Sequence, residues 1–211
     1  MHSIAKGILS IFMVVQMTCL ATSGMAHSAI RTIPKEKEDE TLISRKTTIG
    51  WFFGPAVKFS EINDEFAVLT GGHAGLIINR TFIIGISGYG LVNEIAVGAP
   101  GNRLLDFGYG GLFLGYVNRS HKIVHLSIHS LIGGGGLCYR TYFYDDWYED
   151  WHDDAIFVLE PGVDLMLNVT RHFRIGLGGS YRFVSGVDFD GLSNDDLSGP
   201  SASLTFKLGK F

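Results

Sequence analysis

The sequence is poor in the features that mark several large classes of protein. Although 46% of its 211 residues are hydrophobic, no segment after the N-terminal leader has the roughly 18 consecutive apolar residues that a spanning helix needs. The formal net charge is -4, so the chain offers no basic surface for a nucleic acid partner. Proline is scarce, at 5 residues, whereas glycine is abundant, at 28. Abundant glycine without a collagen repeat is typical of strands that bend and pack closely.

Cysteine is also scarce, and what remains of it depends on how the N-terminus is processed. An apolar segment at 7–20 and a small-x-small site ending at Ala26 predict a signal peptide over residues 1–26. Cleavage near Ala26 would remove Cys19 and leave Cys138 alone, which excludes an intrachain disulfide. The alternative is a lipoprotein signal with Cys19 as the acceptor, which the residues before that cysteine favour less.

The remainder divides into a polar leader and eight strand-like segments. Residues 27–46 are polar, mixed in charge and without apolar period, and predict a solvated periplasmic leader. From Thr47 onward apolar residues alternate with small or polar ones, most clearly in Val124–His129 and Ser203–Leu208. Lipid outside and a small polar lumen inside require this pattern. We therefore expect an all-β fold over residues 47–211, an eight-stranded antiparallel up-and-down transmembrane β-barrel. The predicted strands are 47–60, 65–78, 81–93, 104–117, 122–137, 155–169, 173–186 and 200–211.

The connections between these strands carry independent information. Three are tight and contain an Asn followed by an Arg: Asn79–Thr81, Asn118–Ser120 and Asn168–Arg171. Asn suits tight turns because it tolerates left-handed backbone. The other connections are longer or more polar: Ser60–Asp64, Asn93–Arg103, Tyr139–Asp154 and Val187–Pro200. A strict alternation of short and long connections is the outer-membrane rule of short periplasmic turns and longer outer loops.

Aromatic residues gather near the predicted periplasmic rim, where an interfacial girdle is expected. They are Trp51, Phe82, Tyr116, Phe173 and Phe211. Chance placement is the alternative, since aromatic residues make up 12% of the chain.

Charged residues on the predicted inner face form a second pattern. Folding the sixth and seventh strands about their tight turn places Glu160 opposite Arg182, with Leu177 outward. The predicted lumen network contains Glu160, Asp164, Arg174, Arg182 and Lys207. Because an eight-stranded barrel is just wide enough for side chains to fill it, we expect a packed polar core without a channel. Buried charges of this kind are tolerable when they are paired.

Histidine spacing suggests a metal site, but strand geometry argues against it. His121, His125 and His129 recur every four residues, which on a strand separates neighbours by about 13 Å. They cannot share a metal ion at bond lengths near 2 Å, so we expect no metal. His125 and Ser127 also raise the possibility of an acyl-transfer site, but neighbours two apart on one strand face lie about 6.6 Å apart, beyond direct hydrogen-bond reach. We expect no catalytic residues and no cofactor.

The segment from Tyr142 to Asp154 is the most unusual in composition, because it interleaves carboxylates with aromatics. The predicted topology places it on the cell surface near a second acidic stretch. Candidate binding residues are Asp145, Asp146, Trp147, Glu149, Asp150, Trp151, Asp188 and Asp190. One interpretation is a recognition loop for a partner, a glycan or a cation, since exposed aromatic surface marks interaction sites. The other is a solvated loop whose aromatics pack on the barrel mouth. No EF-hand spacing is present.

Over residues 47–211 the chain resembles the small eight-stranded outer-membrane proteins of the OmpX, opacity and attachment-invasion type. The resemblance rests on eight strand-like segments, the rhythm of the connections and the ending 203–211. It implies that the barrel-insertion machinery engages the last strand through Phe211. In that family the last Phe shares the outward face, whereas here it alternates in phase with Gly209 and Lys207. Either a bulge near Gly209 restores the usual register, or the ending is less diagnostic of that family than the rest of the pattern.

These observations leave three hypotheses for function. The first is a non-enzymatic barrel of the cell outer membrane, surrounded by lipid, whose outer loops meet an unknown surface partner, a glycan or the lipopolysaccharide layer. The second is a barrel enzyme that modifies envelope lipid. The third is a soluble lipocalin-like carrier in the periplasm, which would invert the faces and place Glu160, Arg174 and Arg182 outside.

Overall fold

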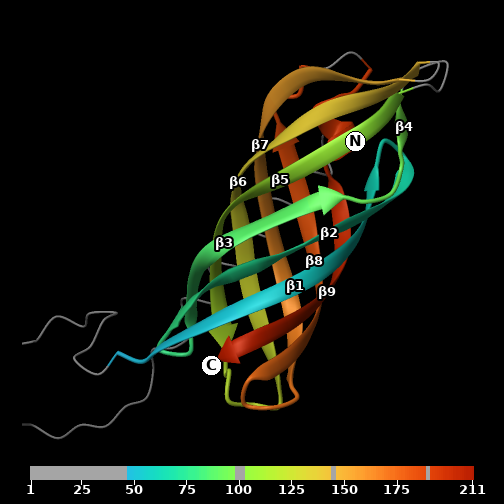
Figure 1. Ribbon diagram of the computed structural model, residues 1–211. Coiled ribbons are helices and arrows are strands. Elements are labelled where there is room, and N and C mark those ends of the chain that lie inside the picture. The colour runs from blue at the N-terminus through green and yellow to red at the C-terminus, as the bar shows by residue number, and fades with distance from the viewer. Residues whose placement is uncertain (1–46, 98–102, 144–145, 189–190) are drawn as a thin grey trace, which may run out of the picture. The chain divides into compact units, whose positions relative to one another are not determined.

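The computed structural model describes residues 47–97, 103–143, 146–188 and 191–211, and within them nearly all of the backbone is strand (Figure 1). The strands are β1 (Ile49–Ile62), β2 (Glu65–Ile78), β3 (Phe82–Leu91), β4 (Ala96–Val97), β5 (Arg103–Asn118), β6 (Val124–Phe143), β7 (Asp146–Asn168), β8 (Phe173–Ser185) and β9 (Gly199–Lys210). One short helix, α2 (Asn194–Leu197), lies between β8 and β9. No helix among the described residues is long and apolar enough to cross a lipid bilayer.

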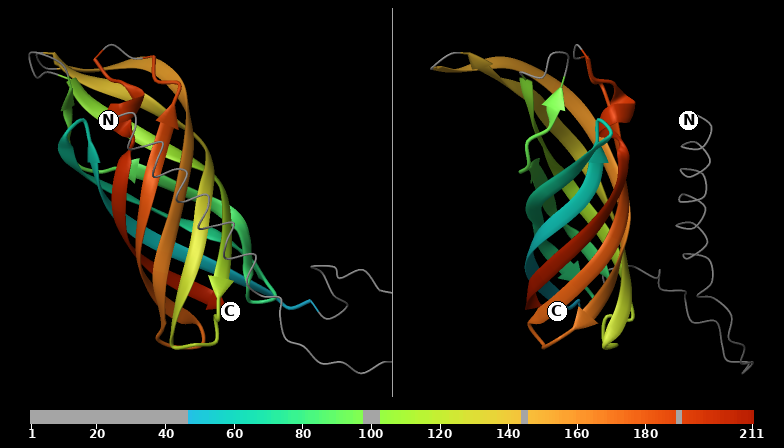
Figure 2. Two further views of the ribbon diagram at one scale, coloured as in Figure 1. Left: turned by 180° about the vertical axis from the view of Figure 1, so that it is seen from behind. Right: turned by 90° about the vertical axis from the view of Figure 1, so that its right-hand side faces the viewer.

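The strands form one antiparallel sheet that closes on itself. The order is β3-β2-β1-β9-β8-β7-β6-β5-β4, and β3 also pairs with β5. That last pairing completes the barrel from the eight long strands, and Figure 2 shows the barrel wall from two further sides. The eight-stranded antiparallel barrel predicted from the sequence is thereby confirmed. The two-residue β4 is an addition, pairing with β5 through Ala96 and Leu104.

Side chains alternate between the two faces of the wall as the sequence predicted. In β8, Arg182 is 0% exposed and Leu177 is 64% exposed. In β1, Lys58 is buried whereas Trp51 and Phe53 are more than half exposed. Large apolar side chains therefore cover the outside of the barrel, and the ionic groups lie within it.

Tight turns and the C-terminus gather at one end of the barrel, here called the turn end; the opposite end is called the loop end. At the turn end three residues, Asn79 to Thr81, connect the paired Ile78 and Phe82, and Asn79 and Arg80 have positive φ, of 52° and 57°. The loop-end connection between β1 and β2 was expected to be long, which was wrong. It consists of Asn63 and Asp64, also with positive φ, because both residue types tolerate left-handed backbone.

The connection predicted between Tyr139 and Asp154 is also mostly strand. β6 continues to Phe143 and β7 begins at Asp146, with Tyr142 paired to Trp147. A register shift between Leu137 and Tyr139 marks the point where the hairpin extends beyond the predicted strands. Aromatic residues favour strands, and this preference outweighs the many carboxylates of the segment.

The final strand runs without a bulge, so the expected correction near Gly209 is absent. Its register against β1 is continuous from Lys210 opposite Trp51 to Ser201 opposite Ser60. The ring of Phe211 accordingly packs against the apolar cluster inside the turn end, and it does not belong to an outer girdle. The other predicted rim aromatics lie on the outer face as two ring pairs and Trp51: Phe82 with Tyr116, and Phe173 with Phe206.

Candidate functional site

The interior of the barrel is layered, and is not uniformly polar as the sequence suggested. An apolar cluster fills the loop-end half and includes Leu69, Phe107 and Val158. A smaller cluster built on Phe52 and Phe113 fills the turn end. The ionic groups lie between these two clusters. The expectation failed because many inward positions of the first five predicted strands are aliphatic or aromatic. Among their described residues Lys58 is the single buried Lys, Arg, Asp or Glu.

Glu160 lies at the centre of the ionic layer. Its Oε1 is 2.6 Å from the Nζ of Lys58 on β1 and accepts a 2.5 Å hydrogen bond from Ser180 on β8. Its Oε2 accepts a 2.7 Å hydrogen bond from the hydroxyl of Tyr109 on β5. The Lys58 ammonium also lies 3.5 Å from the centroid of the Tyr89 ring. Side chains from three other strands, β1, β5 and β8, thus converge on one carboxylate.

Asp164 holds a second ionic contact nearer the turn end. Its Oδ2 lies 3.3 Å from Nδ1 of His129 and 3.7 Å from Nζ of Lys207. Two glycines make room for this group. A Cβ on Gly178 would collide with the Asp164 carboxylate, and a Cβ on Gly162 would come within 2.6 Å of the His129 ring. The wall can therefore pack closely around the Asp164 carboxylate because these two positions are glycine.

Arg182 does not pair with Glu160, although the predicted register of β7 against β8 is observed. Its Nε donates to the carbonyl oxygen of Leu197 at 2.7 Å, and its Nη2 lies 3.4 Å from the hydroxyl of Ser60. The expected pair fails because Lys58 reaches Glu160 from across the lumen. Arg182 instead holds the C-terminal residue of α2 against the barrel.

The segment around α2 covers the loop end. Leu192 and Leu197 are buried in the apolar cluster. The amide of Ser193 donates to Asp196 at 2.7 Å as part of a capping box, and Asp196 accepts from the Asn63 amide through its carbonyl at 2.8 Å. These contacts join the last long connection to the first turn, so the loop end is closed by packed chain.

Only some of the predicted surface residues belong to the part of the chain that the structure describes. Asp145 and Asp190 fall outside the described residues, and Asp188 is exposed. The remaining members contribute backbone to the extension of β7, and their side chains are not among those described: Asp146, Trp147, Glu149, Asp150 and Trp151. The proposed binding group is therefore carried by a strand extension at the loop end, and its composition still rests on the sequence.

The histidines and Ser127 separate in space. His125 is buried with its Nδ1 3.3 Å from the carbonyl oxygen of Lys122, and no hydrogen bond between it and Ser127 exists among the described residues. His129 contacts Asp164, and His121 lies at the turn end. The described part of the chain contains no group of three metal-ligating side chains.

Sequence reasoning missed Lys58, Tyr109 and Ser180, the three partners of Glu160. The inward position of Lys58 could have been predicted from the sequence, because it alternates in phase with inward Ala56 and Ser60. Its contact with Glu160 could not, because the two residues are 102 positions apart and meet only when the barrel closes.

Comparisons with solved structures match this geometry. Neisserial surface protein A aligns with a TM-score of 0.52 at 13% identity, over 79% of this chain and all of that one. The chain has the fold of a small eight-stranded outer-membrane β-barrel. The N-terminal barrel domain of OprF from Pseudomonas aeruginosa (TM-score 0.48, 10% identity, 75% and 96% coverage) and Ail from Yersinia pestis (0.47, 14%, 76% and 97%) also align. No family model and no curated protein sequence matches the chain.

Proposed function

We propose that the protein is a non-enzymatic surface barrel of a bacterial outer membrane, whose loop end interacts with a partner, a glycan or the lipopolysaccharide layer. The observation that carries this proposal is the opposite exposure of Leu177 and Arg182 on one strand. An apolar exterior is stable in hydrocarbon and unstable in water. It favours a membrane barrel over a soluble carrier, in which the apolar face would line a ligand cavity.

The filled interior supports a structural rather than a conducting role. Two apolar clusters and an ionic layer occupy the space between the walls. An eight-stranded barrel has room for its own side chains and little more. The separation of His125 from Ser127 offers no support for the lipid-modifying alternative.

The loop end is the surface that we assign to recognition. The hairpin of β6 and β7 extends beyond the predicted barrel strands, and its sequence from Tyr142 to Asp154 combines six carboxylates with six aromatic residues. A sequence that combines apolar and anionic groups suits a protein, a glycan or a cation-bridged lipopolysaccharide. In the same proposal the barrel-insertion machinery engages β9 and Phe211.

Proteolysis of intact cells tests the location and the orientation together. Added protease should cut within 143–154, whereas the tight turn at Asn118–Ser120 should be cut only after the outer membrane is permeabilised. The turn serves as a control within the same chain. Mass spectrometry of the released peptides identifies each site. Cleavage of both regions in intact cells, or recovery of the protein in a detergent-free soluble fraction, would contradict the proposal.

A further inference from the structure

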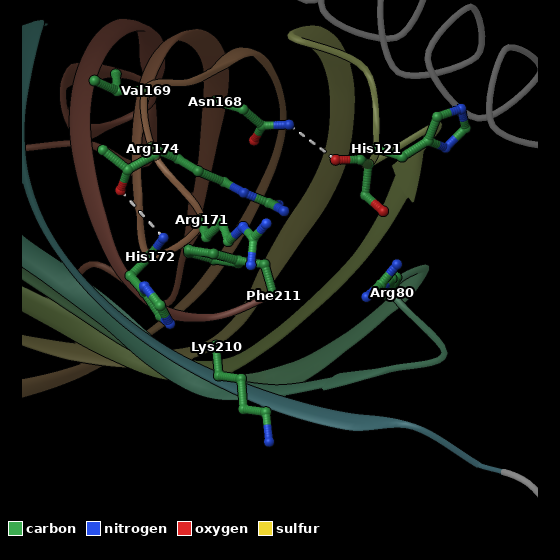
Figure 3. Close-up of a pocket in the computed structure, with 11 residues that line it drawn as sticks. Arg80, His121, Asn168, Val169, Arg171, His172, Arg174, Lys210 and Phe211 are labelled. Atoms are coloured by element: carbon green, nitrogen blue, oxygen red, sulfur yellow. Dashed lines mark hydrogen bonds between the residues drawn. The ribbon is translucent and has the colours of Figure 1, made fainter.

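The turn end contains a hollow that the proposed function does not use. It has a volume of about 510 Å³ and is formed by the three tight turns together with the last two residues (Figure 3). We call it the turn-end basin; its lining residues are Arg80, Ser120, His121, Asn168, Val169, Thr170, Arg171, His172, Arg174, Lys210 and Phe211. A volume of this size lies within the range of small-molecule sites.

The basin is strongly cationic. Three arginines and one lysine line it, and no Asp or Glu is among the lining residues. In Figure 3 the side chains of Arg171 and Arg174 lie beside Phe211, Arg80 lies across the opening, and Lys210 points away. The Asn and Arg shared by the tight turns thus have a consequence in space, because two of the three turns bring an arginine to one hollow.

Arg174 lines the basin and is the one of its cations that is buried. It is 8% exposed, and its Nε has no hydrogen-bond partner within the part of the chain that the structure describes. The guanidinium lies 3.7 Å from the centroid of the Phe211 ring, so a ring face is its described contact. The buried lysines of the same lumen behave differently, since Lys58 and Lys207 contact carboxylates. A buried cation without a counter-charge is costly, and an anion in the basin would remove that cost.

We infer that the turn-end basin binds a multivalent oxyanion with the chemistry of a phosphate or phosphate ester, held by Arg174 from below and by Arg171 and Arg80 from the sides. Guanidinium groups suit this ligand because they donate paired hydrogen bonds to two oxygens of one phosphate. Several cations around one hollow favour a ligand with more than one negative charge. The phosphate is either free in solution or part of a lipid headgroup at the same membrane face.

Calorimetric titration of the refolded full chain in uncharged detergent micelles tests the inference, with inorganic phosphate as the probe. The expected result is saturable uptake at one site that weakens as salt is added. Arg171→Gln should weaken binding by about tenfold or more, the loss expected for a hydrogen bond to a charged group. Arg80→Gln should act in the same direction.

Arg119→Gln is the matched control. Arg119 follows an Asn in a tight turn and has a φ of 54°, close to the 57° of Arg80, but it does not line the basin. This variant should bind phosphate as the parent does. No saturable uptake, or an equal loss in Arg119→Gln and Arg171→Gln, would overturn the inference. An unchanged thermal transition in each variant shows that loss of binding is not loss of fold.

Lipid nanodiscs separate the two sources of phosphate. If phosphatidylglycerol, compared with phosphatidylcholine, displaces inorganic phosphate from the parent but not from the Arg171→Gln variant, the ligand is a headgroup. If neither lipid competes, the ligand is a soluble phosphate compound. Either outcome supports the inference, and neither depends on what the loop end binds.

Discussion

Two arginines on one strand show how differently the two ends of this barrel are closed. Arg182 and Arg174 both point inward from β8, eight residues apart, and both are more than nine-tenths buried. Arg182 donates hydrogen bonds to Leu197 and Ser60, and so joins the covering segment to the wall, although its Nη1 has no partner among the described residues. Arg174 lies on the ring of Phe211 with its Nε unbonded.

The comparison of Arg182 with Arg174 shows that burial alone does not determine the role of a charged side chain. At the loop end the chain supplies the acceptors for its own cation, which makes Arg182 part of the architecture. At the turn end the lining residues supply more cations and almost no counter-charge. The loop end, where Arg182 has acceptors from the chain, needs no ligand for stability. The turn end, where Arg174 lacks a carboxylate partner, would be stabilised by the anion that we propose.

The largest expected effect concerns the ionic layer that separates the two ends. Lys58→Met leaves the Glu160 carboxylate buried with only Tyr109 and Ser180 as partners. We expect the free energy of unfolding to fall by about 3–5 kcal/mol, the usual cost of leaving one member of a buried pair. Equilibrium urea unfolding of the refolded protein in micelles measures it.

The double variant Lys58→Met with Glu160→Leu is the control for that measurement. Removing both charges should restore most of the lost stability, because the penalty comes from the unpaired carboxylate. A double variant as unstable as the sum of the two single variants would show that the ionic layer stabilises through packing alone.

A second prediction concerns the outer face that both ends share. Leu177→Arg places a charge on the lipid-facing surface, where Leu177 is 64% exposed. The expected loss is about 2–4 kcal/mol in a bilayer if the position lies near its midplane. Refolding into phosphatidylcholine vesicles measures it, with Leu177→Val as the conservative control. Equal stability of the arginine variant and the control would remove the membrane assignment.

The third prediction sharpens the comparison of the two arginines directly. Arg182→Met should lower the free energy of unfolding by about 1.5–3 kcal/mol, the range for hydrogen bonds to a charged group. It should also speed hydrogen exchange at the Val184 amide, which donates to Ser198 in the covering segment. Arg174→Met should leave that exchange rate unchanged. Faster exchange at Val184 in both variants would mean that the two ends are coupled.

The sequence predicted what depends on local alternation and failed where distant strands meet. The outward position of Leu177 and the inward position of Arg182 follow from period two within a single strand, and both are observed. The pairing of Glu160 with Lys58 depends on which side chain reaches across the closed lumen, which no local pattern encodes.

The features at the two ends of the barrel also differ in how far they could be predicted from local sequence. The Asn-Arg turns were visible in the sequence, but the basin was not, because it requires that turns from separate hairpins surround one opening. The β6–β7 extension was wrongly predicted to be a loop, because its many carboxylates were given more weight than the strand preference of its aromatic residues. The Asn residues of the sequence predicted three tight turns. A fourth, formed by Asn63 and Asp64 with positive φ, was expected to be a longer connection.

The smallest expected effect tests the contact between the Arg174 guanidinium and the ring of Phe211. Phe211→Ala removes the ring beneath its guanidinium, which lies 3.7 Å from the ring centroid. A cation–π contact of this kind contributes about 0.5–2 kcal/mol, so the loss of stability should fall in that range. Phe211→Leu keeps apolar volume against Phe52 and its neighbours but lacks the ring, so it separates packing from the charge contact. If Phe211→Leu matches the parent in urea unfolding, the ring acts only as filler and Arg174 has no ring-dependent stabilisation. If it is destabilised to the same extent as Phe211→Ala, the aromatic face is the partner of Arg174, and a phosphate added to either variant should recover part of the lost stability because it supplies the counter-charge that the ring replaced.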